Sequence, residues 1–424
     1  WVISPSTEGD DDLPINLQDE QNRLWATMLY FFGSGTAGRM SPDWDLGGWI
    51  DRMRTLKPTI TAQNIDLLFR LHDGTDLALQ GETRDSHGSS SEQHLLEFVA
   101  TRQVRVKDLA IQPPGNGQLL LSTMSSVVSS GTELKVFRGE FETGGQLDTT
   151  IKGMADEKME YPLHYGYSLV GEVIQAGEDV NMDSVKGKLV FSFAPHGSHA
   201  IVDHDSAMFV PPGIPAEDAC YLPAVETALS LVQDARPVVG EKIAVYGQGM
   251  IGLLVTAILS RNFGSDNVIA IEMNAERAAV SRMIGAGQVV HPVDLAQNSS
   301  VMPPIDVAIE VSGNAAALQT ALDYTQPGGR VILGSWYGAK SASLRLGLDF
   351  HRSQLSIKCS QVSKLPADLS GRWDKARRFD ETWKWVRLIK PSRFLSTTTV
   401  PLAEAQHAYE LLDKGETLGV QFAY

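Results

Sequence analysis

Cysteine is scarce in this sequence. The 424 residues include two cysteines, Cys220 and Cys359. Two are too few for a disulfide framework and too few for a zinc site built from thiolates. We therefore expect a reducing intracellular compartment, and the residues do not distinguish the cytoplasm from an organelle stroma or matrix.

Long apolar runs and positive charge are also scarce. The longest apolar run extends from Met250 to Leu259 and is well short of a membrane span. The chain has 36 Lys and Arg against 51 Asp and Glu, which gives a formal net charge of −15. Nucleic acids and anionic membranes are bound by concentrated positive charge. We therefore expect no membrane span and no nucleic-acid partner.

The first 93 residues differ in composition from the rest. They contain an acidic tail, a helical extension over 21–80 and a linker rich in Gly, Ser, Asp and Glu. The extension carries aromatic residues of the kind that anchor protein interfaces, such as Trp25 and Trp44. It either binds a protein partner, covers its own domain or is the tail of a preceding domain.

The remaining chain changes its pattern once. Short strands with turn signals over 94–238 predict a β-rich domain. From 239 to 371 strands alternate with helices, which is typical of a parallel sheet with crossovers. Six strands are expected there, at 242–246, 268–272, 288–291, 306–311, 330–334 and 355–359. The final segment, 372–424, predicts a helix, a strand, a second helix and a closing strand.

A glycine-spaced turn follows the first strand of the alternating region. Gly247 permits a tight turn, Gly249 lets the backbone approach a pyrophosphate, and Gly252 lets the helix pack closely on the sheet. The helix N-terminus at Met250 and Ile251 offers N–H groups and a positive dipole end to phosphates. This arrangement predicts a dinucleotide site.

An acid at the end of the second strand bears on the choice of dinucleotide. Glu272 lies where a carboxylate accepts hydrogen bonds from the adenosine ribose, and its charge would repel a 2′-phosphate. Arg277 lies five residues later and is able to compensate. We therefore favour NAD(H), with NADP(H) as the alternative.

Five motifs occur in the order of a known family. They are Ser-Ser-Gly-Thr-Glu-Leu at 129–134, Tyr-Pro-Leu-His-Tyr-Gly-Tyr at 161–167 with Val-Gly-Glu-Val at 170–173, the glycine turn, Asp-Val-Ala-Ile-Glu-Val-Ser-Gly-Asn at 306–314 and Gln-Pro-Gly-Gly-Arg-Val at 326–331. Over residues 94–424 the chain resembles the medium-chain dehydrogenase/reductase family, the alcohol-dehydrogenase-like proteins.

The resemblance implies an α/β protein with two parts. A GroES-like β-rich catalytic domain (94–238) would be completed by 372–424, and a Rossmann doubly wound parallel sheet would occupy 239–371. Substrate would bind between the two parts, and the chain would pair as a homodimer. Ser312, Gly313 and Ser335 would flank the cofactor by the same resemblance.

The residues at the family's zinc-ligand positions depart from its pattern. Ser130 replaces a cysteine, Tyr167 replaces a histidine, and Pro223 falls on the third ligand. Stable tetrahedral zinc sites use thiolate, imidazole or carboxylate ligands. We therefore expect no zinc and no other metal.

Without zinc, hydrogen-bond donors must serve the oxygen that gains charge during hydride transfer. Thr132 matches the hydroxyl that begins the proton relay of the zinc enzymes, or else stabilises a turn. Tyr167 is either a neutral phenol donor, since free tyrosine titrates near ~10, or a packing residue. Glu226 is a general base or a helix cap, and Ser130 lies beside these candidates.

Two histidines lie on the shortened loop. His196 and His199 are possible proton shuttles, although two histidines without a third ligand make no metal site.

These features predict a zinc-independent, NAD(H)-dependent oxidoreductase that interconverts a secondary alcohol and a ketone. The zinc-lacking pattern looks most like the branch containing bacteriochlorophyllide (hydroxyethyl) dehydrogenases. The alternatives are an NAD(P)H-dependent enone or quinone reductase, and a dinucleotide-binding structural or regulatory subunit with little turnover.

Overall fold

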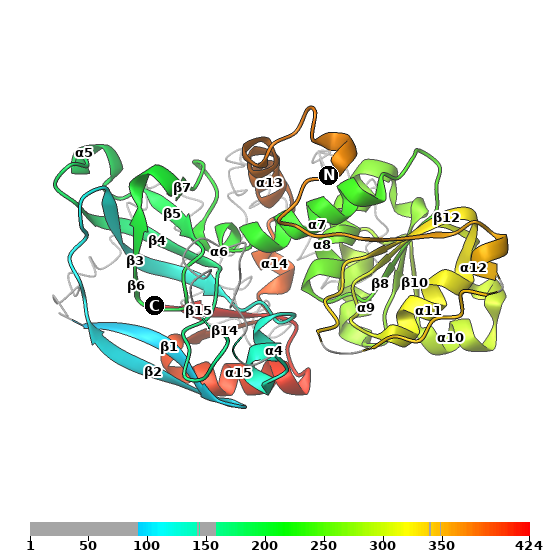
Figure 1. Cartoon of the computed structure of the whole chain (residues 1–424), viewed down its shortest axis with the longest axis horizontal. Helices are drawn as coiled ribbons and strands as arrows, with labels where there is room; N and C mark the ends of the chain where they lie inside the picture. Colours follow the sequence, from blue (N-terminus) through cyan, green and yellow to red (C-terminus); the bar gives the residue numbers. More distant parts are fainter. Residues whose placement is uncertain (1–91, 142–143, 145–157, 339–340, 348) are drawn as a thin grey trace, which may run out of the picture. The chain divides into compact units, whose positions relative to one another are not determined.

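The structure is a computed structural model that describes residues 92–141, 144, 158–338, 341–347 and 349–424 (Figure 1). The expected acidic tail, the helical extension (21–80) and its partner lie outside the described residues. The described chain begins with strand β1 (Glu92–Ala100), which pairs antiparallel with β2 (Gln103–Ala110).

The β-rich part contains a seven-stranded sheet in the order β14-β15-β3-β4-β5-β7, and β6 also pairs with β3. Its strands are β3 (Gln118–Val127), β4 (Leu169–Ala176), β5 (Leu189–Ser192), β6 (His199–Asp203), β7 (Met208–Phe209), β14 (Thr398–Pro401) and β15 (Val420–Ala423). Strand β15 pairs antiparallel with β3, so a segment from the C-terminal region joins this sheet.

The second sheet is parallel and has the order β10-β9-β8-β11-β12-β13. Its strands are β8 (Ile243–Tyr246), β9 (Val268–Ile271), β10 (Gln288–Val290), β11 (Ile305–Glu310), β12 (Thr325–Leu333) and β13 (Ser356–Cys359). This is the doubly wound order of dinucleotide-binding sheets, and it confirms the predicted fold class. Strand β12 begins at Thr325 rather than at 330, because it pairs with β11 through a register shift.

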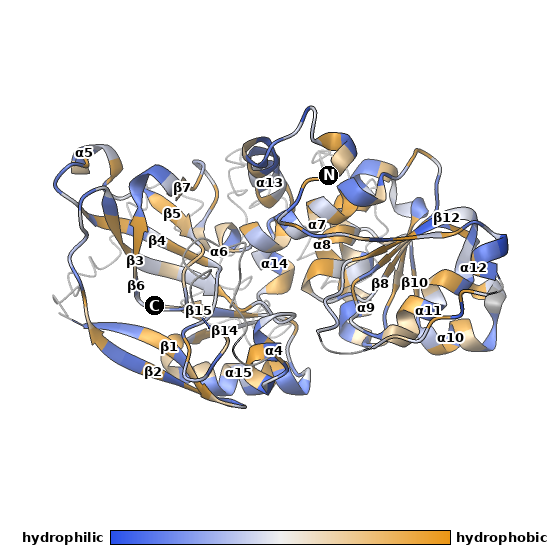
Figure 2. Cartoon of the chain, viewed as in Figure 1, coloured by the Kyte–Doolittle hydropathy of each residue, from blue (hydrophilic) through white to orange (hydrophobic). Residues whose placement is uncertain are grey.

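Helices bury both faces of the parallel sheet. In β8, Ile243 and Val245 pack in one apolar cluster, whereas Ala244 and Tyr246 pack in another. Figure 2 shows the strands of this sheet as predominantly apolar. The α-helices of the described residues are α4 (Glu133–Arg138), α5 (Met182–Val185), α6 (Ala216–Ala219), α7 (Leu222–Ala235), α8 (Met250–Phe263), α9 (Ala275–Met283), α10 (Pro292–Gln297), α11 (Ala315–Tyr324), α12 (Asp349–Arg352), α13 (Lys375–Ile389), α14 (Ser392–Leu395) and α15 (Ala405–Lys414).

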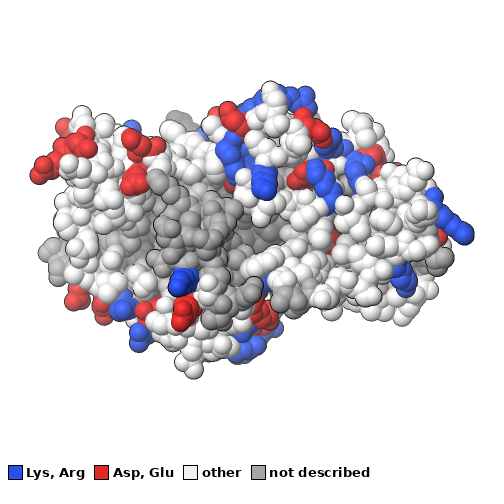
Figure 3. Space-filling model, in the orientation of Figure 1, with Lys and Arg blue, Asp and Glu red and all other residues white. Residues whose placement is uncertain are grey.

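Charge on the surface is mixed in sign. On the face in Figure 3, Lys and Arg gather over α13, with Asp and Glu among them. Among the described residues, no helix combines the length and apolar character that crossing a membrane requires.

Candidate active site

The glycine turn between β8 and α8 is built by close backbone contacts. Gly247 has a φ of 91°, and a Cβ there would lie 2.7 Å from the Ser312 Cα atom. A Cβ on Gly252 would lie 1.9 Å from the Gly247 carbonyl oxygen. The turn and the first turn of α8 therefore pack too closely for any side chain at these two positions.

The remaining glycine of the turn, Gly249, faces open space. Gly249 precedes α8 as its N-cap, and a Cβ there would meet no atom within 4 Å. The first N–H groups of a helix, here at Met250 and Ile251, have no intrahelical acceptor. This end of α8 is therefore open on the side where an anion can approach those N–H groups.

Glu272 closes the same turn from the end of β9. Its Oε2 accepts the Gln248 N–H at 2.7 Å, and its Oε1 accepts the N–H groups of Met273 and Asn274 at 2.9 and 2.8 Å. The carboxylate is buried. Glu272 thus fixes the glycine turn relative to β9 in addition to its predicted role beside a ribose.

Ser312, Gly313 and Ser335 meet at the carboxyl ends of β11 and β12. The Gly313 N–H donates to the Ser335 Oγ at 2.8 Å. Beneath them, the fully buried Glu310 accepts the Ser312 N–H at 2.7 Å and the Tyr337 hydroxyl at 2.9 Å. Ser312 also lies against Gly247, so the predicted cofactor residues of these two strands border the glycine turn.

Glu310 was missed by the sequence reasoning, although it lies within a quoted motif. The sequence does carry a signal for it, because Glu310 is a carboxylate at the end of the apolar strand β11. Burial raises the pKa of Tyr337, and the charge of Glu310 raises it further, so the phenol remains protonated and able to donate.

Hydroxyl groups gather where the sequence departs from the zinc pattern. The Tyr167 hydroxyl donates to the Ser129 Oγ at 2.5 Å and lies 3.3 Å from the Thr132 Oγ1. Thr132 is the N-cap of α4, yet its side chain makes no capping hydrogen bond. The serine that contacts Tyr167 is therefore Ser129 rather than its neighbour Ser130, the predicted site residue.

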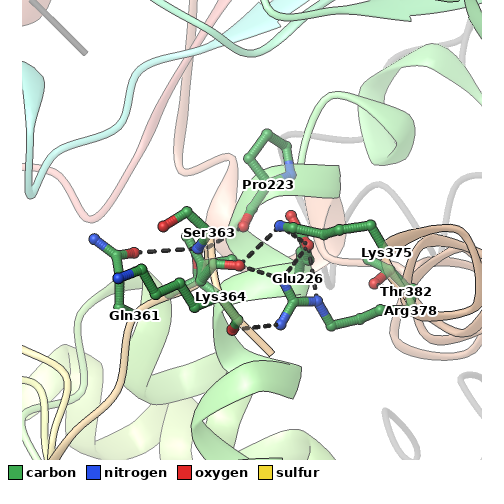
Figure 4. A network of polar contacts seen from close by, with 10 residues as sticks. Pro223, Glu226, Gln361, Ser363, Lys364, Lys375, Arg378 and Thr382 are labelled. Atoms are coloured by element: carbon green, nitrogen blue, oxygen red, sulfur yellow. Dashed lines mark hydrogen bonds and ion pairs between the residues drawn. The ribbon is translucent and has the colours of Figure 1, made fainter. Parts of the chain in front are cut away.

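Glu226 is engaged in a buried ion pair (Figure 4). Its Oε1 accepts the Arg378 Nε–H at 2.9 Å and the Lys375 ammonium at 3.0 Å. Arg378 is fully buried and also donates to the backbone carbonyls of Val362 and Lys364. Burial lowers the pKa of Lys375, against the raising effect of Glu226. These contacts join α7 to α13 and suit a structural role better than that of a general base, which remains a prediction.

A contact also connects the two parts of the site. The Lys135 ammonium lies 4.1 Å from the centre of the Trp336 ring and donates to the Trp336 carbonyl. Lys135 belongs to α4, which follows Thr132, and Trp336 follows Ser335. The hydroxyl cluster and the cofactor-side residues therefore lie on segments in direct contact.

The side chains at the expected zinc positions do not match zinc chemistry. Ser130, Tyr167 and Pro223 offer a hydroxyl, a phenol and no donor, in place of thiolate, imidazole or carboxylate. Within the described ranges, no three His, Cys, Asp or Glu residues are grouped to hold a metal ion.

Comparison with known proteins supports one family. The family model described as zinc-binding dehydrogenase matches residues 251–378. D-guloside 3-dehydrogenase of Escherichia coli (strain K12) is 28% identical over 271 residues, covering 60% of this chain and 77% of that protein. L-threonine 3-dehydrogenase of Caldanaerobacter subterraneus is 26% identical over 304 residues, covering 62% and 82%.

Solved structures share the fold. An alcohol dehydrogenase of Escherichia coli CFT073, complexed with NADH, has a TM-score of 0.62 at 17% identity and covers 79% of this chain and all of its own. A protein of Sinorhizobium meliloti 1021, bound to NADP, has a TM-score of 0.62 at 18% identity with the same coverage.

The fold is thus alcohol-dehydrogenase-like, with a GroES-like part and a Rossmann sheet. The chain is an oxidoreductase that is similar to the zinc-binding dehydrogenases over residues 251–378 and to the two dehydrogenases named above over a longer part of its length. Its relatives are dehydrogenases of guloside and threonine, which supports a dehydrogenase of alcohol-type substrates.

Proposed function

We propose that this chain interconverts a secondary alcohol and a ketone with NAD(H) and without zinc. The observation that carries the proposal is the hydroxyl cluster that Ser129 and Thr132 form around Tyr167, which occupies one of the expected zinc-ligand positions. The contact of Lys135 with Trp336 supports it, because it brings the cluster's segment to the cofactor side.

The residues around the glycine turn fit a dinucleotide. The N–H groups at Met250 and Ile251 would bind the pyrophosphate through the open side of Gly249. Glu272 retains acceptor capacity for the adenosine ribose, and Ser312 and Ser335 would border the other ribose. When bound, the nicotinamide exchanges a hydride with the substrate carbon.

The hydroxyl cluster would donate a proton to the substrate oxygen or accept one from it. Serine, threonine and tyrosine hydroxyls each donate one hydrogen bond and accept others, so a chain of them can reverse its direction. During ketone reduction Tyr167 would donate its proton to the oxygen that gains charge, and Ser129 or Thr132 would donate a proton to Tyr167. Solvent would then return a proton to that serine or threonine hydroxyl, which is partly exposed. During alcohol oxidation the same bonds reverse.

The test combines metal analysis with turnover. The purified chain is assayed on a panel of secondary alcohols with NAD+ and NADP+, before and after dialysis against a chelator. We expect activity that survives the chelator, a preference for NAD+, and a loss on the order of 10²- to 10⁴-fold in kcat for Tyr167→Phe.

The matched control is Tyr161→Phe, because the Tyr161 hydroxyl donates to the Val136 carbonyl and not to the cluster. It should retain full turnover. Activity that requires one zinc per chain would overturn the proposal. Turnover limited to enones or quinones favours the reductase alternative, and NADH binding without turnover favours the structural subunit.

A further inference from the structure

A buried carboxylate–imidazole pair lies behind the hydroxyl cluster. The His196 Nε2 lies 3.0 Å from the Glu133 Oε2, and both side chains are fully inaccessible to solvent. An imidazole N–H is a donor and a carboxylate oxygen an acceptor, so the contact is a hydrogen bond when the ring carries its proton on Nε2. A buried polar group that loses its hydrogen-bond partner destabilises the folded protein. The contacts of Glu133 and His196 therefore show which segments the pair holds together.

Glu133 reaches the hydroxyl cluster through the backbone. Its Oε1 accepts the Ser129 N–H at 2.7 Å, and the Ser129 hydroxyl accepts from Tyr167. Its Oε2 also accepts the Tyr409 hydroxyl at 2.5 Å, from helix α15. The carboxylate therefore fixes the turn that presents Ser129 and Thr132.

His196 reaches the other wall of the cluster through packing. Gly166, the residue before Tyr167, has a φ of 126°, and a Cβ on it would lie 2.6 Å from the His196 Cδ2. The imidazole ring therefore occupies the space beside the backbone that carries Tyr167. On its other side, Nδ1 lies 2.7 Å from the Ser126 Oγ, which contacts the Tyr424 hydroxyl at 2.7 Å.

We propose that His196 is a positioning residue that couples the two walls of the hydroxyl cluster. Through Glu133 it holds the turn of Ser129, and through Gly166 it holds the backbone of Tyr167. The donor and acceptor that exchange the substrate proton thereby keep a fixed separation. This inference rests on the proposed function of the cluster, but its geometry can be tested without turnover.

The experiment separates the hydrogen bond of His196 from its ring. His196→Gln retains an N–H donor toward Glu133, whereas His196→Phe retains a ring against Gly166 and removes both polar contacts. Tyrosine labelled with a carbon isotope at Cζ is introduced into each protein. The NMR resonance of Tyr167 is assigned by its loss in Tyr167→Phe and reports the hydrogen bonding of that phenol.

We expect the Tyr167 resonance to move in His196→Phe and to return toward its original position in His196→Gln. On an alcohol that the enzyme oxidises, kcat should fall on the order of 10²-fold in His196→Phe with an unchanged KM for NAD+. His196→Gln should recover most of that loss. NADH binding, measured by fluorescence, serves as the control for an intact nucleotide site.

The proposal is overturned if the resonance stays in place in His196→Phe while the melting temperature alone falls. If that variant does not fold, Glu133→Gln provides the same test, because an amide cannot accept from Ser129, His196 and Tyr409 together. A chain that oxidises no alcohol would defeat the proposed function, whereas the resonance would still decide the positioning role.

Discussion

Single side chains in this protein owe their chemistry to their neighbours. The Tyr167 phenol lies within hydrogen-bond distance of two hydroxyls, each of which can donate or accept a hydrogen bond, and the proposed proton transfer depends on these two neighbours. Glu226 has the same carboxylate as any general base, yet a fully buried arginine and a lysine hold it. Burial and partners, rather than residue type, therefore separate the candidate catalytic groups from the structural ones.

The two cysteines should differ sharply in reactivity. Cys220 is buried, and burial raises its pKa to about 12, whereas Cys359 is exposed on β13. Because the thiolate is the reactive form, a disulfide-exchange reagent at about pH 8 should modify Cys359 rapidly and Cys220 only after unfolding in urea. Cys359→Ser should abolish the rapid reaction. Equal rates for both thiols would contradict the burial of Cys220.

Sequence reasoning found Thr132 and Tyr167 but not the residues that hold them. Glu133 and His196 are in contact although they lie 63 positions apart, and Ser129 and Tyr167 are in contact although they lie 38 positions apart. No local sequence pattern encodes contacts of this kind. The sequence predicts His196 as a possible proton shuttle, but the structure buries it fully between Ser126 and Glu133, which the residues of its loop do not specify.

At the scale of elements, substitutions of two glycines in the β8–α8 turn should have different effects on the stability of the folded protein. Gly252→Ala places a Cβ against the Gly247 carbonyl, and such overpacking costs about 1–3 kcal/mol. Gly249→Ala meets open space and has an ordinary φ of −74°, so it should leave the melting temperature unchanged.

The same two variants should differ in cofactor binding as well as stability. Gly249→Ala should weaken NADH binding in a fluorescence titration, because its methyl group occupies the space expected for the pyrophosphate. Gly252→Ala should lower both stability and affinity. Unchanged NADH affinity in Gly249→Ala would show that the open side of this glycine is not the cofactor side.

The ion pair between α7 and α13 should matter for stability. Glu226→Ala leaves Arg378 buried without a charged partner, and breaking a buried pair in this way costs about 3–5 kcal/mol. Urea unfolding measures the loss. The control is Glu381→Ala, whose partner Lys384 is exposed on the same helix, with an expected cost below about 1 kcal/mol.

Turnover of a Glu226 variant tests the alternative that Glu226 is a general base. Glu226→Gln keeps the shape of the side chain but also leaves Arg378 without a charged partner, so a purely structural residue should lose stability and keep near-normal kcat in the folded variant. A collapse of kcat in the folded variant would restore Glu226 as a general base.

The elements themselves were largely predictable. Five of the six strands of the parallel sheet lie within one residue of their predicted bounds, because alternating apolar runs and turn residues specify them locally. Strand β12 extends further because it continues through Pro327 and two glycines, which local rules assign to a turn. The pairing of β15 with β3 is a contact between distant segments, and the family resemblance implied only that 372–424 completes the β-rich part.

At the scale of the whole molecule, many groups that ionise at alkaline pH are buried. Burial raises the pKa of Cys220 to about 12 and raises the pKa values of Tyr221, Tyr246, Tyr409 and Tyr424 above their ordinary value. Tyr246 and Tyr221 lie in the apolar clusters that support the parallel sheet. Folding therefore keeps several weak acids in their neutral form.

Stability should consequently fall as the pH rises. For a group whose pKa is higher in the folded state, the stabilisation is complete below the unfolded pKa and is lost as the pH rises through the folded pKa. For Cys220 that interval runs from 9.0 to about 12. Each such group steepens the decline by about 1.4 kcal/mol per pH unit. Urea unfolding between these pH values should show a smaller decline for Cys220→Ser, whose hydroxyl does not titrate there, and an unchanged one for Cys359→Ser. If both variants decline as the original protein does, the Cys220 thiolate is not excluded from the folded core.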